Sequence, residues 1–106
     1  MLVDVNSALE ELGLDKEDFD EFVDDLKAFL EEGMPALKGA IESEDFTEVR
    51  AQAHAIKGAL ANLRFVQSAD VAKKLEEMGR TSTDNGMASS YAELEKSLAD
   101  SYAELG

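Results

Sequence analysis

The spacing of the apolar residues constrains the fold of this chain more than any other feature. Large apolar side chains recur at intervals of three and four residues along most of the 106 positions, and this spacing places them on one face of an α-helix. No segment alternates apolar and polar residues in the way that is typical of a half-buried strand. Four main apolar stripes with short connections predict an all-α protein, namely an antiparallel four-helix bundle with a short additional N-terminal helix packed across it.

The first half of the sequence predicts a short helix followed by a long one. The short helix ends at Gly13, a residue type that commonly terminates helices. Asp15 can cap the next helix, whose first turn is rich in acidic residues. We expect that helix to span about residues 16–43, kinked or briefly broken near Pro35, with a clean break into two helices as the alternative. Most of its large apolar residues are assigned to the core by default, and its apolar stripe comprises Phe19, Phe22, Val23, Leu26, Phe29, Leu30, Met34, Leu37 and Ile41.

The second half of the sequence predicts three further helices. The segment Asp45-Phe46-Thr47-Glu48 resembles a capping box and opens a helix over about residues 45–65. Ser68 is predicted to cap a short helix that stops at Gly79. Residues 81–86 are rich in turn formers and form the clearest loop of the chain. The final helix is predicted from one apolar stripe, which comprises Met87, Tyr91, Leu94, Leu98, Tyr102 and Leu105.

Length and composition limit the kind of protein that this chain can be. We expect one domain over residues 1–106 with a modest core. The absence of cysteine excludes disulfides and suits a reducing cytoplasm. The N-terminus has no basic region followed by a long apolar run, and no stretch approaches the ~20 apolar residues that cross a bilayer. We therefore expect a soluble cytoplasmic protein, and Met1 at the start with no trailing linker favours a free-standing one.

The charge of the chain is strongly negative and unevenly distributed. The formal net charge is −14, which disfavours nucleic acid and anionic membranes as partners because both require a basic surface. Residues 1–46 and 81–106 together contain 20 acidic and 4 basic residues, whereas residues 47–80 contain 4 acidic and 6 basic residues. We assign most carboxylates to solvated surface. The nearly balanced central segment is where an incoming anionic group would be repelled least.

The only histidine of the chain lies in this central segment. The apolar stripe of its helix comprises Phe46, Val49, Ala53, Ile56, Leu60 and Leu63. His54 points roughly 130° away from the centre of that stripe, so we expect its side chain to be exposed. Lys57 and Gly58 lie on the same face one turn later, and Ala61 lies two turns along. A glycine inside a helix costs about 1 kcal/mol relative to alanine, so Gly58 indicates a place where another molecule comes close.

The segment from His54 to Leu63 also carries a family resemblance. Its sequence, His-Ala-Ile-Lys-Gly-Ala-Leu-Ala-Asn-Leu, resembles the H-x-(I/L)-K-G-(S/A)-x-A-N-L signature of histidine-containing phosphotransfer (HPt) domains. These domains are helical bundles that relay a phosphoryl group between aspartates of response-regulator receiver domains. The resemblance extends along nearly the whole chain. Two departures are Arg64, where the family usually has glycine, and Leu60, where it usually has a small residue.

The resemblance implies a specific role for His54. It would accept a phosphoryl group from a receiver aspartate and pass it to another receiver, and a hybrid sensor histidine kinase would be a further partner. Lys57 would offset charge on the phosphoryl oxygens. The expected docking surface comprises Arg50, Gly58, Ala61 and Glu76, of which Glu76 falls where the family often places a polar residue facing the histidine. The resemblance further implies a monomeric carrier without cofactor or metal, which is not an autonomous enzyme.

Other functions find less support in the sequence. One histidine and no cysteine exclude the usual zinc and di-iron ligand sets, and neither a P-loop nor a calcium loop is present. An acyl carrier protein needs a serine at a helix start, and the nearest match, Asp100-Ser101-Tyr102, lies inside the last predicted helix. The competing hypothesis is an interaction module of the same fold that docks a partner without phosphotransfer. A domain cut from a larger hybrid kinase would be chemically the same protein.

Overall fold

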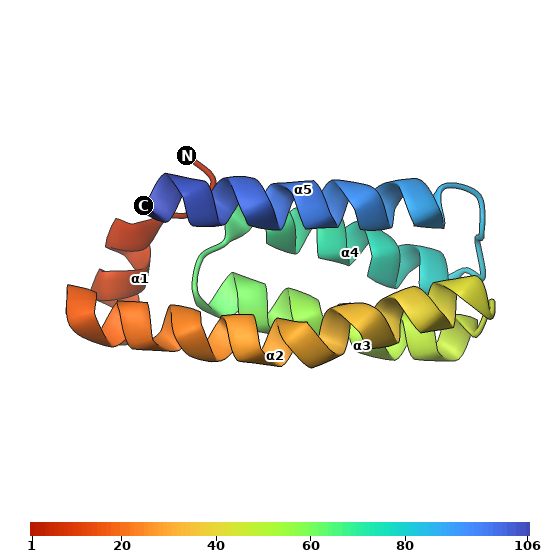
Figure 1. Ribbon diagram of the computed structural model, residues 1–106, viewed down its shortest axis with the longest axis horizontal. Coiled ribbons are helices and arrows are strands. Elements are labelled where there is room, and N and C mark those ends of the chain that lie inside the picture. The colour runs from red at the N-terminus through yellow and green to blue at the C-terminus, as the bar shows by residue number, and fades with distance from the viewer.

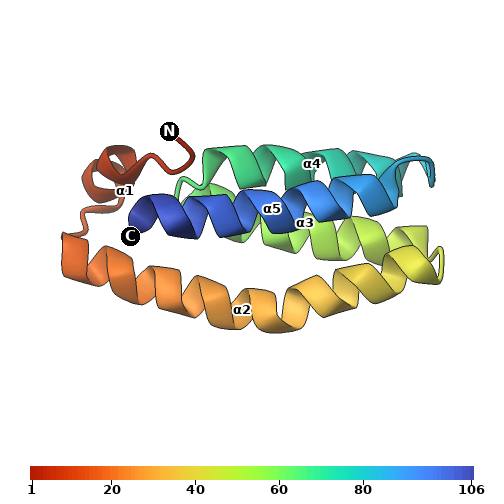
Figure 2. The ribbon, with the colours of Figure 1, turned by 45° about the horizontal axis from the view of Figure 1, so that its top comes forward.

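The computed structural model describes all 106 residues and consists of five α-helices without a strand. The helices are α1 (Val5–Leu12), α2 (Lys16–Glu42), α3 (Phe46–Asn62), α4 (Val66–Arg80) and α5 (Met87–Leu105). Helices α2 to α5 run antiparallel to their chain neighbours along an elongated bundle of 41 × 20 × 20 Å, and α1 crosses one end (Figures 1 and 2). The predicted all-α four-helix bundle with an additional N-terminal helix is therefore confirmed.

Helix α2 continues through its internal proline without interruption. The Asp15 carboxylate caps it as predicted, because it accepts a hydrogen bond from the backbone nitrogen of Asp18 at 2.8 Å. Pro35 has no amide hydrogen to donate to the preceding turn, but its side chain is exposed and the helix bends near its middle without a break (Figure 2). The alternative of a clean break into two helices is wrong.

The core excludes two aromatic residues that the sequence placed there. Phe22 and Phe29 are 46% and 43% exposed. Each precedes a buried residue, Val23 or Leu30, by one position, and neighbouring positions of a helix point about 100° apart. In both pairs the second residue faces the core and the phenylalanine lies at the surface, so the assignment of Phe22 and Phe29 to the core is wrong.

Helix α3 is shorter at both ends than predicted, spanning Phe46–Asn62. At its end, Arg64 adopts a left-handed φ of 64°. The backbone nitrogen of Phe65 donates to the carbonyl of Leu60 at 2.9 Å, and that of Arg64 to the carbonyl of Ala61 at 3.1 Å. These two bonds form a Schellman motif, in which the left-handed position is usually glycine. Arg64 thus occupies this position without changing the backbone of the turn.

The Arg64 side chain offsets the unfavourable backbone conformation, which costs roughly 1–2 kcal/mol for a residue other than glycine. Its guanidinium donates to the carbonyls of Ala61 and Asn62 at 3.0 and 3.1 Å. It also forms an ion pair with Glu11 of α1 and reaches the Ser7 hydroxyl at 3.3 Å. The hydrogen bond from Arg64, and then its charge, lower the pKa of Glu11. Arg64 therefore joins the end of α3 to α1.

The capping box predicted at the start of α3 forms only in part. The Asp45 carboxylate accepts a hydrogen bond from the backbone nitrogen of Glu48 at 3.2 Å. The Glu48 carboxylate instead accepts from the side chain of Gln52 at 2.7 Å. The backbone nitrogen of Asp45 is already occupied, since it donates to the carbonyl of Ala40 at 3.0 Å. The reciprocal bond of a capping box is therefore absent.

Helix α4 begins earlier and ends later than predicted. Ser68 was expected to cap it and Gly79 to stop it, and neither residue does so. Ser68 is fully buried inside the helix, and its hydroxyl lies 2.7 Å from that of Ser97 in α5, so the prediction that it caps the helix is wrong. Gly79 does not stop α4, which continues to Arg80. A Cβ at Gly79 would lie 2.7 Å from the backbone nitrogen of Arg50. This glycine therefore allows close packing of α4 against α3.

Candidate functional site

The candidate site lies on the outer surface where α3 and α4 pack together, the most extensive helix pair in the bundle. His54 of α3 places its Nδ1 2.7 Å from Oε2 of Glu76 on α4. The other carboxylate oxygen of Glu76 accepts a hydrogen bond from Nζ of Lys57 at 2.6 Å. The His54 side chain is 69% exposed, whereas that of Glu76 is 16% exposed. One largely buried carboxylate thus holds two side chains of the neighbouring helix.

Glu76 fixes which ring nitrogen of His54 carries the proton. The hydrogen bond from Lys57 lowers the pKa of Glu76; partial burial opposes this, and the hydrogen bond from His54 lowers the pKa further. An ionised carboxylate can only accept hydrogen bonds, so the donor is the Nδ1–H of His54. In the neutral ring, Nε2 then has a free lone pair. The arrangement supplies an exposed nucleophilic nitrogen whose ring orientation is fixed.

Of the remaining predicted site residues, Arg50 lies beside His54 and Glu76, whereas Gly58 and Ala61 lie further along α3. Arg50 lies one turn before His54 and makes no ion pair or side-chain hydrogen bond. A hollow of about 360 Å³ is lined by Thr47, Arg50, Ala51, His54 and Glu76. Gly58 and Ala61 do not line this hollow, although both are exposed on α3. A Cβ at Gly58 would meet no atom within 4 Å, so the space beside this residue is open.

An exposed apolar surface on the other side of α3 was missed in the sequence. Phe22 and Phe29 of α2 line a hollow of about 200 Å³ together with Ala59, Asn62 and Leu63 at the end of α3. The signal was present, because each phenylalanine is followed directly by another large apolar residue. Adjacent helix positions point about 100° apart, so one residue of each such pair lies nearer the edge of the apolar stripe and is the candidate for the surface.

Two structural tests bear on other classes of function. No group of three or more histidine, cysteine, aspartate or glutamate side chains is arranged to hold a metal ion. None of the five helices combines the length and the apolar character that are needed to cross a membrane. The site itself presents an oriented imidazole, one carboxylate and nearby cations.

Comparison with known protein families agrees with this geometry. A family model described as the Hpt domain matches residues 6–105, essentially the whole chain. No significant match was found among curated proteins or among solved structures. The match spans all five helices, including the segments that carry His54, Lys57 and Glu76. The chain therefore belongs to the Hpt domain family, whose members transfer phosphoryl groups through a histidine in two-component phosphorelays.

Proposed function

We propose that residues 1–106 form one phosphotransfer domain in which His54 accepts a phosphoryl group from a receiver aspartate and passes it to another receiver. The observation that carries this proposal is the hydrogen bond between His54 Nδ1 and Glu76, because it leaves Nε2 unprotonated on an exposed ring. In the first transfer, Nε2 bonds to phosphorus while the bond from phosphorus to the aspartate oxygen breaks. The aspartate leaves as a carboxylate, and the second transfer reverses these changes.

The surrounding charges suit this transfer. When Nε2 bonds to phosphorus, the ring becomes cationic and Nδ1 keeps its proton, which the Glu76 carboxylate stabilises through the 2.7 Å hydrogen bond. Lys57 keeps Glu76 ionised and adds positive charge beside the transferring oxygens. Arg50 is free of ion pairs and lines the same hollow as His54. Its guanidinium can therefore bind a phosphoryl oxygen or an acidic group of the receiver.

The protein is then a carrier rather than an autonomous enzyme, with receiver domains and a hybrid sensor histidine kinase as partners. A monomer is sufficient, because His54, Lys57 and Glu76 all come from one chain. Gly58 and Ala61 extend the docking surface along α3, where small residues allow the receiver to approach. The competing function is a bundle that docks a signalling partner without exchanging phosphate. An oriented nucleophile favours exchange, because a docking surface alone has no need for one.

The experiment is incubation of the protein with a phosphorylated receiver domain. We expect an acid-labile, alkali-stable phosphate on the wild-type protein and none on the His54→Gln variant. Glutamine can still donate a hydrogen bond to Glu76, and position 54 is exposed, so the variant should unfold within about 0.5 kcal/mol of wild type. Labelling of His54→Gln at the wild-type level would exclude His54 as the acceptor. A stable receiver complex without labelling of the wild type would support the docking module.

A further inference from the structure

A second surface of the bundle is apolar and lies away from His54. Helices α2 and α5 pack against each other far less extensively than α3 and α4 do. Between them lies a groove of about 450 Å³. Its lining residues are Lys27, Leu30, Glu31, Met34, Glu95, Leu98, Ala99 and Tyr102. The two helices that line the groove, α2 and α5, lie nearer the viewer in Figure 1, and α3 and α4 lie behind them.

The groove continues toward the end of the bundle at which α1 crosses. A second hollow of about 230 Å³ adjoins it and shares Lys27 and Tyr102 as lining residues. On α2 the combined lining extends from Lys16 to Met34. At a rise of about 1.5 Å per residue, this distance is roughly 27 Å, or about five turns of a helix. The combined surface, here called the α2–α5 groove, is therefore long enough to hold one helix of about 15 residues.

The basic residues of the α2–α5 groove already have partners within the protein. Lys27 lies over the ring of Tyr102, with its Nζ 4.9 Å from the ring centroid. Lys16 forms an ion pair with Asp20 at 2.6 Å. Lys16 is thus neutralised by a carboxylate, and Lys27 is the one basic residue of the groove that keeps its positive charge without an ion pair.

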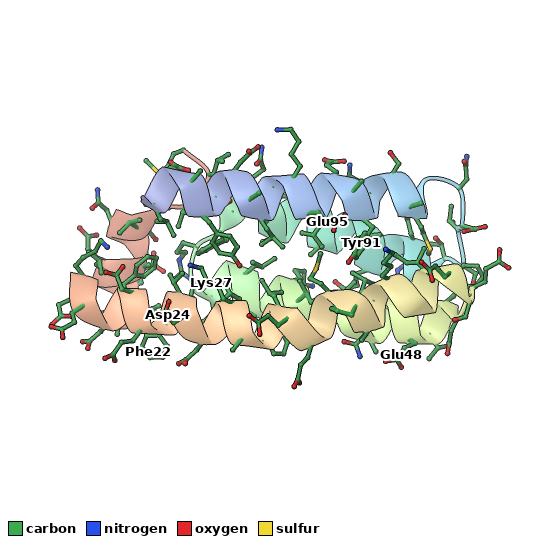
Figure 3. The ribbon with its side chains drawn as sticks, viewed as in Figure 1. Phe22, Asp24, Lys27, Glu48, Tyr91 and Glu95 are labelled. Atoms are coloured by element: carbon green, nitrogen blue, oxygen red, sulfur yellow. The ribbon has the colours of Figure 1, made fainter.

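Three acidic residues at the rim, in contrast, have no ion-pair partner. Asp24, Glu31 and Glu95 appear in none of the salt bridges and side-chain hydrogen bonds of the structure. Figure 3 shows Asp24 on α2 and Glu95 on α5, on the face where the two helices run side by side. Burial, and then the charges of Glu95 and Glu42, raise the pKa of Tyr91, which lies one turn before Glu95 on α5. The rim is thus negative around an apolar floor.

We propose that the α2–α5 groove binds a basic amphipathic helix of a partner protein. Apolar side chains of that helix at positions i, i+3, i+4 and i+7 would enter between Leu30, Leu98 and Tyr102. Lysine or arginine residues on its flanks would pair with Asp24, Glu31 and Glu95. A second copy of this chain is a poor occupant, because its net charge of −14 repels an acidic rim.

This inference goes beyond phosphotransfer and does not require it. The groove lies on the side of the bundle opposite to the pair α3 and α4, from which His54 and Glu76 project. A helix bound in the groove therefore leaves His54 accessible to a receiver. The groove can hold the carrier on a partner protein while phosphoryl transfer continues at His54.

The test uses a synthetic amphipathic helix of about 15 leucine and lysine residues as the probe. Its dissociation constant is measured by calorimetry at physiological ionic strength. We expect Glu31→Lys/Glu95→Lys to weaken binding by at least about tenfold, because two attractive rim pairs become repulsive. The control Glu21→Lys/Asp70→Lys changes the net charge equally at two exposed acidic positions outside the groove. It should weaken binding by less than about threefold.

A third variant separates docking in the groove from general charge attraction. Ala99→Glu adds negative charge to the exposed wall of the groove but also fills space on its apolar side. Docking predicts weaker binding of the peptide, whereas attraction by charge alone predicts tighter binding. A peptide with serine in place of leucine should not bind. Saturating peptide should change the rate of phosphoryl transfer to wild-type protein by less than about twofold.

Several results would overturn the proposal. No binding by wild type, equal weakening by both charge-reversed variants, or tighter binding by Ala99→Glu would each exclude a specific groove for a basic helix. A dimer of the protein alone that Ala99→Glu dissociates would assign the groove to a second copy. A peptide that blocks phosphoryl transfer would show that the two surfaces are not independent. The binding and dimer measurements do not depend on His54 being the phosphoryl acceptor, and only the transfer measurement does.

Discussion

Helices α3 and α4 pack closely, whereas helices α2 and α5 leave a groove between them. The close pair positions the side chain of His54, and the open pair offers a surface for a partner. The α3–α4 pair is so close that Gly79 leaves no room for a Cβ against the backbone of Arg50. Across this contact, Glu76 holds both His54 and Lys57. The α2–α5 pair is open, apolar at its floor and lined by unpaired carboxylates. A tight contact can fix the direction of a reactive ring, whereas an open one leaves surface for another molecule.

The largest expected effect is on the free energy of unfolding, when a side-chain atom is added where α3 and α4 already touch. Gly79→Ala would place a methyl group 2.7 Å from a backbone nitrogen, so the helices must move apart. We expect a loss of about 1–3 kcal/mol in the free energy of unfolding. The matched control is Gly39→Ala in α2, where a Cβ meets no atom within 4 Å. The control should stabilise the protein by up to ~1 kcal/mol.

Urea unfolding of both glycine variants measures this contrast. The free energy of unfolding should change in opposite directions, with Gly79→Ala less stable than wild type and Gly39→Ala more stable. Equal stability of the two variants would show that the close approach of α3 and α4 is not rigid. The geometry that joins His54 to Glu76 would then need another explanation.

The next effect concerns the carboxylate that bridges the two helices. Glu76→Gln keeps a hydrogen-bond acceptor for His54 but removes the negative charge that stabilises the cationic ring. We expect phosphoryl transfer from a receiver to slow by about tenfold. Glu77→Gln is the control, because Glu77 pairs with Arg80 and does not contact His54. Transfer rates measured by rapid quench should separate the two variants, and equal rates would leave Glu76 without a positioning role.

A smaller effect on the rate of phosphoryl transfer is expected at Gly58, beside which the receiver is proposed to dock. Gly58→Gln introduces a side chain into open space one turn from His54. The attacking nitrogen and phosphorus must approach within about 3–3.5 Å, and the new side chain would meet the rim of the receiver pocket first. Transfer from a receiver should slow by about fivefold. Labelling by phosphoramidate, a small donor that needs no docking, should stay at the wild-type rate, and a loss with both donors would contradict the docking role.

The sequence was sufficient to predict the fold because the apolar spacing is local information. Five helices, the Asp15 cap and the exposed position of His54 all follow from residues close to one another in the chain. The roles of Ser68 and Gly79 could not be predicted in this way. Ser68 is buried by Ser97, which lies 29 positions away, and Gly79 is required by the backbone of Arg50. Local rules for caps and helix ends therefore assigned both residues to the wrong role.

In the candidate site, too, some residues could be found from local sequence and others depend on how the helices pack. His54, Lys57 and Gly58 were found from their spacing within one helix. Glu76 was placed facing His54 only through the family resemblance, because its hydrogen bond depends on how α4 packs against α3. The α2–α5 groove had no local signal, since its width is set by the whole bundle.

The smallest expected effect is on the pH dependence of stability at the tight pair of helices. The hydrogen bond from Lys57, ahead of that from His54, lowers the folded-state pKa of Glu76 below its ordinary value of 4.5. A carboxyl group with a lowered pKa stabilises the folded state above the unfolded pKa, and that contribution is lost as the pH falls through the folded value. Between neutral pH and about pH 3, Glu76→Gln should therefore lose less stability than wild type, by under about 1 kcal/mol.

The control is Glu95→Gln in the open pair of helices, where the carboxylate has no ion-pair partner. Urea unfolding at the two pH values should distinguish Glu76→Gln from wild type and from this control, and identical losses in all three proteins would show that the Glu76 contacts add nothing to stability.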